Sequence, residues 1–577
     1  MRQCLSFIAI LLVSFLLPGC SALIHRQAPA QETAKPDPVL PFPNPVTGVT
    51  ELTSEVVFNT LAGEIALQRG QFDRAYKHQM QAAISARDAV AAERATRIAM
   101  LLKRDDQALA AVTHWVALAP NALDGRQLAE LLHFRAGQDD LALTQMEAIL
   151  AISEGRGEDG FITAVLVLSK EQQHDRVMRL VHRFTGQHAD DPRAGYAVAL
   201  LSLIWKDYSG AERDINEVLA RWPRWSKGSI LLSRIRKAQG DNDGALKILR
   251  SVVEQDRNDL EANVALAKLL VETGDFEAGY DQFRRVDRLA PGEPDTSYAL
   301  GVLALQLEKF REAKEYFRQL YDSGNRVDDA AYYLGRIDEQ LEHPDSAIHW
   351  YGQVKKGDYL LDSRVRIARV MADQGRVQEA RHWVQNLRIQ MEEHSVQLYL
   401  LEVSILKDHG SAEDVLALYE RALEDHPDND DILYARGLYA AEIGRMDMLE
   451  QDLRRVIAHN PTNADALNAL GYTYADRSVR FDEARRLISQ ALSLKPESPA
   501  ILDSMGWLQY RLGNYQQALE YLRRAYELMP DAEIAAHLGE VLWVTGDKTG
   551  AQKIWHQILG KEPDNRHVRE TMERLEK

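Results

Sequence analysis

Residues 500–530, AILDSMGWLQYRLGNYQQALEYLRRAYELMP, combine the signals of two short helices joined by a turn. Gly506 has no Cβ atom, so the first helix can approach its partner closely at that point. Gly513 lies where the first helix should end, because glycine is favoured just past a helix C-terminus. Ala518 keeps the second helix narrow at the crossing, and Pro530 ends it. The spacing therefore predicts a helix–turn–helix unit.

The same unit recurs along most of the chain at intervals of 33 to 35 residues. The positions equivalent to Gly506 are Ala199, Ser233, Ala267, Gly301, Gly335, Ala368, Val403, Gly437, Gly471 and Gly539, with fainter matches at Gly63, Thr96, Glu130 and Val165. The unit resembles the tetratricopeptide repeat, a helix–turn–helix of about 34 residues. One unit cannot bury its own apolar face, so the resemblance implies an all-α superhelical solenoid of about 15 units over residues 53–563.

The N-terminal residues predict export and lipidation. Residues 1–19 carry Arg2 followed by an apolar run over residues 5–17, which is too short for a transmembrane helix and is typical of a signal peptide. The ending Leu17-Pro18-Gly19-Cys20 resembles the bacterial lipobox. That resemblance implies cleavage before Cys20 and lipid attachment to it, and Ser21 then implies sorting to the outer membrane, facing the periplasm. An ordinary secretory signal is the alternative.

Two further segments flank the repeats. Residues 20–52 contain six prolines and predict a semi-extended tether. Its thirty residues 21–50 span about 90 Å at about 3.1 Å per residue. Residues 564–577 place Val568, Met572 and Leu575 on one helical face. They predict a capping helix that covers the last repeat.

Charge, cysteine content and motifs exclude several classes of function. The net charge of −17 does not favour nucleic acid, which is bound through lysine and arginine contacts to phosphate. Only Cys20 remains after signal cleavage, so we expect neither an intrachain disulfide nor a cysteine-based zinc site. Motifs for zinc hydrolases, serine hydrolases and phosphate loops are absent. Ser504 resembles a nucleophile turn but falls in mid-helix. We therefore expect no enzyme activity, cofactor or metal.

The candidate site is a protein-binding surface. In tetratricopeptide solenoids the first helix of each pair lines the concave side. In the last three units the inward positions of this helix hold aromatic and charged residues. This composition is typical of interface cores. The predicted partner-binding residues are Asn468, Tyr472, Asp503, Trp507, Tyr510, Arg511, His537, Glu540 and Trp543, and Tyr298, Tyr332 and Tyr434 continue the stripe. The alternative is that these rings pack between repeats, as we expect for Trp350, Trp383 and Trp555 on second helices.

The C-terminal segments LGYTYADR, LDSMGW and IAAHLGEVLW are similar to those of the outer-membrane lipoproteins that partner the periplasmic carboxy-terminal processing protease. The resemblance implies a non-catalytic adaptor. Such an adaptor binds and activates the serine protease and brings it protein substrates, among them hydrolases of peptidoglycan cross-links. The alternative is an assembly factor for an outer-membrane secretin or pilus, or a general envelope scaffold.

Overall fold

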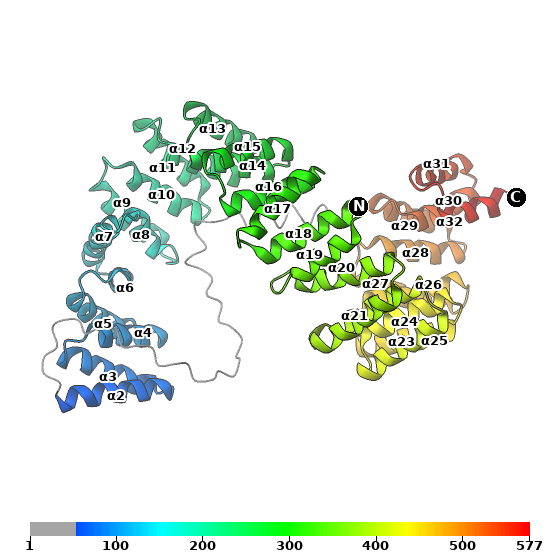
Figure 1. Cartoon of the computed structure of the whole chain (residues 1–577), viewed down its shortest axis with the longest axis horizontal. Coiled ribbons are helices and arrows are strands. Elements are labelled where there is room, and N and C mark those ends of the chain that lie inside the picture. Colours follow the sequence, from blue (N-terminus) through cyan, green and yellow to red (C-terminus); the bar gives the residue numbers. More distant parts are fainter. Residues whose placement is uncertain (1–52, 577) are drawn as a thin grey trace. The chain divides into compact units, whose positions relative to one another are not determined.

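The computed structural model describes residues 53–576, and within this range every regular element is a helix (Figure 1). Residues 1–52 and Lys577 lie outside the described residues, and with them the predicted signal peptide, Cys20 and the tether. From α2 to α31 the helices form fifteen consecutive pairs, and α32 follows them. The chain divides into two compact units, Met1–Tyr316 and Phe317–Lys577, which we describe separately.

The first unit contains seven full helix pairs and the first helix of the eighth. Its helices are α2 (Ser54–Gln68), α3 (Phe72–Ser85), α4 (Ala89–Leu101), α5 (Asp105–Leu118), α6 (Leu123–Arg135), α7 (Asp139–Glu154), α8 (Gly160–Val165), η2 (Leu166–Leu168), α9 (His174–Gly186), α10 (Pro192–Ile204), α11 (Tyr208–Arg221), α12 (Ser226–Ala238), α13 (Asn242–Gln255), α14 (Leu260–Glu272), α15 (Phe276–Leu289) and α16 (Pro294–Gln306). Helix α17 (Phe310–Asp322) spans the division between the units.

The second unit continues the same alternation of first and second helices. It contains α18 (Val327–Gln340), α19 (Pro344–Gln353), α20 (Leu360–Asp373), α21 (Val377–Gln390), η3 (Glu392–His394), α22 (Ser395–Lys407), α23 (Ala412–Asp425), α24 (Asp430–Glu442), α25 (Met446–His459), α26 (Ala464–Asp476), α27 (Phe481–Leu494), α28 (Pro499–Arg511), α29 (Tyr515–Leu528), α30 (Ala532–Val544), α31 (Lys548–Leu559) and α32 (Arg566–Glu576).

Local sequence explains where these helices begin and end. Asp275 accepts a hydrogen bond from the Ala278 backbone N–H at 3.2 Å, and Asn463 accepts one from the Ala466 backbone N–H at 3.0 Å. Such caps satisfy backbone donors that have no partner within the helix. Gly513 has φ +81°, a left-handed conformation that glycine adopts without steric cost. The first helix of the quoted unit therefore ends where the sequence predicts.

The close-approach positions behave as the repeat pattern predicts. A Cβ atom at Gly506 would lie 2.6 Å from Leu522 Cγ, and one at Gly471 would lie 2.6 Å from Ile488 Cγ1. Ala518, which faces this crossing, is fully buried. Any larger side chain at these positions would push the two helices of a pair apart.

Irregularities occur where the sequence departs from the repeat. The turn before α27 holds Ser478 and Arg480 at φ +57° and +47°, which accommodates the extra residue of that unit. Residues 354–359 form an irregular connection between α19 and α20, where the usual proline stop is missing. The unit around Val165 is degenerate, since α8 is a single short helix that continues into η2.

The core of each unit is a row of apolar clusters shared between neighbouring pairs. One cluster in the second unit extends from Leu433 to Leu508, and the next extends from Ala518 to Val568. First helices also contact the first helices of the following pairs, as α26 does α28 and α28 does α30. This arrangement brings side chains of three consecutive first helices together at the C-terminal end.

Candidate protein-interaction surface

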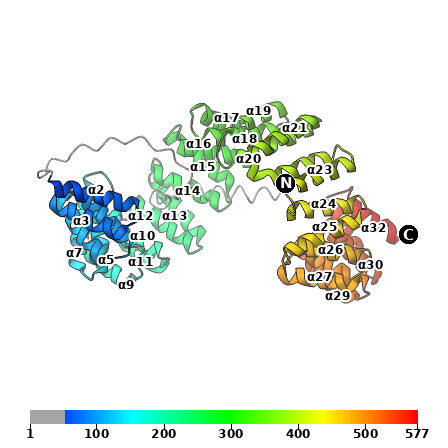
Figure 2. The ribbon, with the colours of Figure 1, turned by 90° about the horizontal axis from the view of Figure 1, so that it is seen from below.

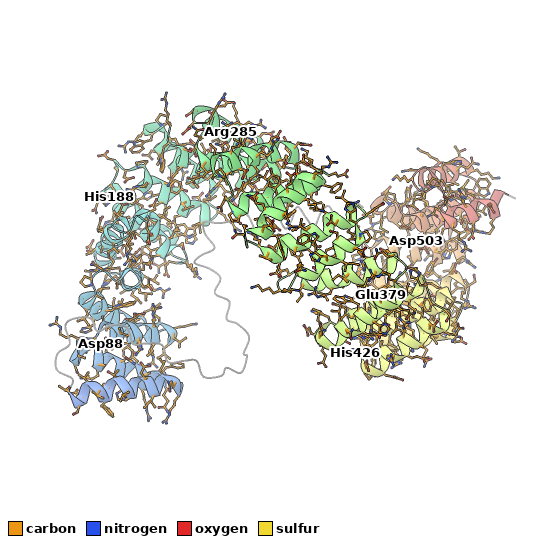
Figure 3. All side chains as sticks on the ribbon, viewed as in Figure 1. Asp88, His188, Arg285, Glu379, His426 and Asp503 are labelled. Carbon is orange, nitrogen blue, oxygen red and sulfur yellow. The ribbon has the colours of Figure 1, made fainter. Side chains whose placement is uncertain are left out.

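The nine predicted partner-binding residues all lie on three consecutive first helices of the second unit. Asn468 and Tyr472 come from α26, and Asp503, Trp507, Tyr510 and Arg511 from α28, where Figure 3 labels Asp503. His537, Glu540 and Trp543 come from α30. The repeat spacing of about 34 residues thus places them on adjacent helices of one layer.

His537 is the centre of the cluster that these helices form. Its Nδ1–H group donates to both carboxylate oxygens of Asp503, at 3.1 and 2.9 Å. Its ring stacks on Trp507 with centroids 4.1 Å apart, and its Nε2 atom lies 3.5 Å from the Tyr472 hydroxyl. The Tyr472 hydroxyl donates to Glu533 Oε1 at 3.1 Å. One imidazole therefore links α26, α28 and α30.

A second network joins α28 and α30 to the last helix. The Tyr510 hydroxyl donates to Glu540 Oε1 at 3.0 Å, and Arg574 of α32 pairs with the same carboxylate. Burial, followed by the charge of Glu540, raises the pKa of Tyr510 to about 12. Tyr510 therefore stays protonated near neutral pH and acts as a hydrogen-bond donor.

The exposure of this surface differs from the sequence-based expectation. We expected its rings to be exposed in a groove, and for Trp507 this is wrong. Trp507 is 6% exposed, His537 9%, and Asp503 and Glu540 5% each. The Trp507 indole packs between repeats and its Nε1–H donates to Asp476 Oδ1 at 3.1 Å. Trp507 therefore packs between repeats, and this favours the alternative interpretation for this ring.

Five of the nine predicted residues, Asn468 among them, are half-buried, and four of these carry aromatic or charged side chains. Tyr472, Tyr510, Arg511 and Trp543 are half-buried, each with part of its side chain in solvent. Arg511 lies 5.6 Å from the Trp507 ring centroid and 3.7 Å from Asp476, and Lys548 lies 4.6 Å from the Trp543 ring centroid. The buried groups beneath fix these side chains, so the surface is ordered before any partner binds.

Asn468 of α26 carries an unsatisfied polar atom beneath the same surface. Its Oδ1 atom is buried and has no hydrogen-bond partner among the described residues. An acceptor left unsatisfied costs free energy until a donor reaches it.

Three members of the cluster were missed by the sequence analysis. Asp476 lies five residues after Gly471, the same inward position that Arg511 holds after Gly506, so the repeat rule could have found it. Glu533 and Arg574 carry no such signal, because Glu533 precedes the inward positions of α30 and Arg574 lies on α32, outside the repeats.

The aromatic residues elsewhere show how strongly packing dominates. Trp555 is fully buried and Trp350 is buried, as predicted for second helices. Tyr332, predicted to continue the inner stripe, is also buried. It stacks on Tyr359 with centroids 4.1 Å apart and donates to Asp362 at 2.6 Å.

The fold accounts for the sequence features that could have indicated other functions. Ser504 lies within α28 and its hydroxyl donates to the Ala500 carbonyl at 2.9 Å, so the repeat helix accounts for it. Among residues 53–576 no group of three or more histidine, cysteine, aspartate or glutamate side chains is placed to hold a metal ion. The helices of this range are each too short or too polar to cross a membrane.

Comparison with known proteins defines the class. Tetratricopeptide repeat models match residues 237–304, 298–358, 400–447, 450–499 and 499–532. The chain is 37% identical over 549 residues to the TPR repeat-containing protein PA4667 of Pseudomonas aeruginosa, covering 92% of this chain and 90% of that protein. It is also 23% identical over 173 residues to the human protein O-mannosyl-transferase TMTC1, covering 29% of this chain and 20% of that one.

Solved structures with similar folds include the APC/C hetero-tetramer Cut9–Hcn1, at 14% identity and a TM-score of 0.32, covering 91% of this chain and 97% of that one. The MamA protein matches at 19% identity and a TM-score of 0.26, covering 28% of this chain and 89% of that one. The chain belongs to the tetratricopeptide-repeat proteins, in the same family as the Pseudomonas protein. Proteins of this fold are protein-interaction scaffolds and are typically non-catalytic.

Proposed function

We propose that this protein is a non-catalytic adaptor, held at the outer membrane through a lipid on Cys20, that binds and activates a periplasmic carboxy-terminal processing protease. Its repeats would also hold protein substrates, such as hydrolases of peptidoglycan cross-links. The similarity of the segments around Tyr472, Trp507 and His537 to the partners of that protease supports the specific role. The repeat fold supports the general role of binding proteins.

The observation that carries the proposal is the ordered surface on α26, α28 and α30. Tyrosine, tryptophan and arginine are the residues that most often dominate interface energetics. Tyr510, Arg511 and Trp543 are held in place by buried partners and keep part of their surface in solvent. A scaffold that binds protease and substrate on separate surfaces raises their effective concentration, and this favours cleavage without any catalytic group.

The proposal is tested with the chain immobilised and exposed to solubilised envelopes of the source bacterium. A serine protease as the main captured protein supports the adaptor role, and purified protease should then cleave an unstructured protein substrate faster when the chain is added. Capture of a secretin or pilus subunit instead would favour the assembly role. Capture of the protease without any change in its cleavage rate would contradict activation.

The contribution of the surface is measured with Tyr510→Ala combined with Trp543→Ala. We expect partner binding to weaken by more than about 2 kcal/mol, because such anchors dominate interfaces. The control is Leu528→Ala, which removes a side chain that is 48% exposed on second helix α29. Equal affinity of the double variant and the control would place the binding surface elsewhere.

A further inference from the structure

The first helix of the chain, α2, has two apolar faces, and only one of them is packed. Val56, Gly63 and Ala66 are buried against the rest of the first pair. The opposite face carries Val57 at 42%, Phe58 at 62%, Leu61 at 57% and Ile65 at 48% exposure. These positions are one, three, four and seven residues apart, so they form one continuous stripe along the helix.

The stripe lies at the end of a stack of repeats. In Figures 1 and 2, α2 lies at the edge of the first unit's stack, with α3 on its inner side. In an interior repeat, this face of a first helix packs on the preceding pair. Within residues 53–576 no element precedes α2, so the face remains uncovered. End repeats of solenoids require a polar outer face or a cap to stay soluble.

The C-terminal end of the chain shows how such a face is covered. There α32 packs on the last pair, with Val568 fully buried and Met572 and Leu575 partly buried in the same cluster as Trp555. Helix α32 is a short amphipathic segment that directly follows the last repeat. The two ends therefore differ, since the described residues include a cap at one end and none at the other.

The residues that directly precede α2 have a composition suited to this role. Residues 39–49, VLPFPNPVTGV, lie outside the described residues and contain five large apolar side chains among eleven. Residues 21–38 contain only Leu23 and Ile24 of that kind. An apolar, proline-containing segment can lie extended against a helix at low entropic cost, because proline restricts the unfolded chain.

The length of residues 39–49 and their connection to α2 also fit this role. Helix α2 has 15 residues and is about 22 Å long, while eleven extended residues span about 34 Å. Gly48 precedes the start of α2 at Ser54 by six residues in the sequence, where the chain would have to reverse direction, and glycine readily occupies such turns. The segment can therefore reach the whole stripe from its point of attachment.

We propose that residues 39–49 fold back over the exposed face of α2 and form the N-terminal cap of the solenoid, with Leu40 and Phe42 against Leu61 and its neighbours. The spacer between Cys20 and the solenoid then reduces to residues 21–38, about 56 Å when extended. The proposal does not depend on the identity of any partner.

The test measures the reactivity of a cysteine introduced on the stripe. The full chain with Cys4→Ser and Cys20→Ser has no other thiol. Leu61→Cys is reacted with dithionitrobenzoate in this chain and in a version with residues 39–49 replaced by glycine and serine. We expect the thiol to react at least about tenfold more slowly in the intact segment, because it must first become uncovered.

The control is Leu528→Cys, at a side chain of comparable exposure on α29, which should react equally fast in both versions. Light scattering reports the oligomeric state of each sample. Equally fast reaction of Leu61→Cys in both versions would show an uncovered face and overturn the proposal. Slow reaction in both versions together with a dimer would identify a second copy as the occupant and would also overturn it.

Discussion

Glu130 departs from the repeat pattern, and burying its carboxyl group costs free energy. It occupies on α6 the close-approach position that Gly506 holds on α28, and it is fully buried. Neither carboxylate oxygen has a hydrogen-bond partner among the described residues. Burial raises the pKa of Glu130 well above its usual value. The carboxyl group is therefore tolerated mainly in its neutral form.

We predict that Glu130→Gln removes a pH dependence of stability in the first unit. Because the folded-state pKa of Glu130 is raised, the free energy of unfolding is highest below about pH 4.3, the pKa of the unfolded state, where the carboxyl group is neutral. This stability is lost as the pH rises through the folded-state pKa of Glu130. Urea unfolding between acidic and neutral pH should show this loss in the wild type and a flatter profile in the variant. Glu254→Gln, at an exposed glutamate of α13, should behave like the wild type. Parallel profiles for all three proteins would show that Glu130 is charged without penalty.

A second prediction at the residue scale concerns Trp507. Because its ring is buried between α28 and α30, Trp507→Ala should lower the free energy of unfolding of the last repeats by about 3–5 kcal/mol. Trp543→Ala should cost less, since Trp543 is only half-buried. Thermal unfolding by circular dichroism, with hydrogen exchange of residues 499–544, measures both. A Trp507→Ala protein that melts like the wild type would show that this buried ring does not stabilise the last repeats.

At the scale of elements, His537 couples three helices through its protonation state. Burial is the largest single effect and opposes the imidazolium form, but the charge and hydrogen bond of Asp503, together with nearby carboxylate charges, outweigh burial and raise the pKa of His537. Glu533 and Glu540 act in the same direction. The contribution of the raised pKa to stability is complete below about pH 6.5, the unfolded value, and is lost as the pH rises through the folded-state pKa.

We therefore expect hydrogen-exchange protection of α28 and α30, after correction for intrinsic exchange, to fall as the pH rises above about 6.5, the unfolded value. His537→Gln should flatten this dependence. His556→Gln changes an exposed histidine on α31 and serves as the control. Protection that rises with pH in the wild type would contradict the sign of this coupling.

A further prediction concerns the crossing of α28 and α29 in residues 500–530. Ala518→Leu would overpack the contact with α28 at a cost of about 1–3 kcal/mol, because Ala518 is fully buried there. Coupling in a solenoid is mainly between neighbouring repeats. Hydrogen exchange should therefore increase first within residues 468–563. A uniform loss of protection along the chain would mean that the repeats unfold as one body.

At the scale of the whole molecule, the proposed outer-membrane localisation rests on Cys20, which lies outside the described range. A single acyl chain binds membranes weakly, at about 0.8 kcal/mol per buried CH₂, whereas several chains bind firmly. Cys20→Ala should therefore release folded protein from the outer-membrane fraction into the periplasmic extract. Cell fractionation with immunodetection measures this, and circular dichroism confirms that the released protein is helical. A variant that still sediments with the outer membrane would contradict lipid anchoring.

The sequence by itself determined the repeat architecture. Glycine, alanine and proline act locally, through missing Cβ atoms, narrow crossings and chain breaks, and their spacing of about 34 residues is visible without a structure. The fifteen pairs, the helix end at Gly513 and the close contact of Gly506 with Leu522 follow from it. Periodicity also identified the three helices that carry the candidate surface, because equivalent positions in a repeat face the same way.

Only the tertiary structure decided which of these side chains are accessible. Trp507 and Tyr510 are separated by one helical turn, yet one is buried and the other half-exposed. The difference arises from His537, Asp476 and Arg574, which reach them from a neighbouring repeat, a helix end and the terminal helix. The burial of these side chains depends on neighbours that are 30 or more residues distant in sequence. A pattern within one repeat therefore does not predict it. The same holds for α2, whose two apolar faces look alike in sequence and differ only because one has a neighbour.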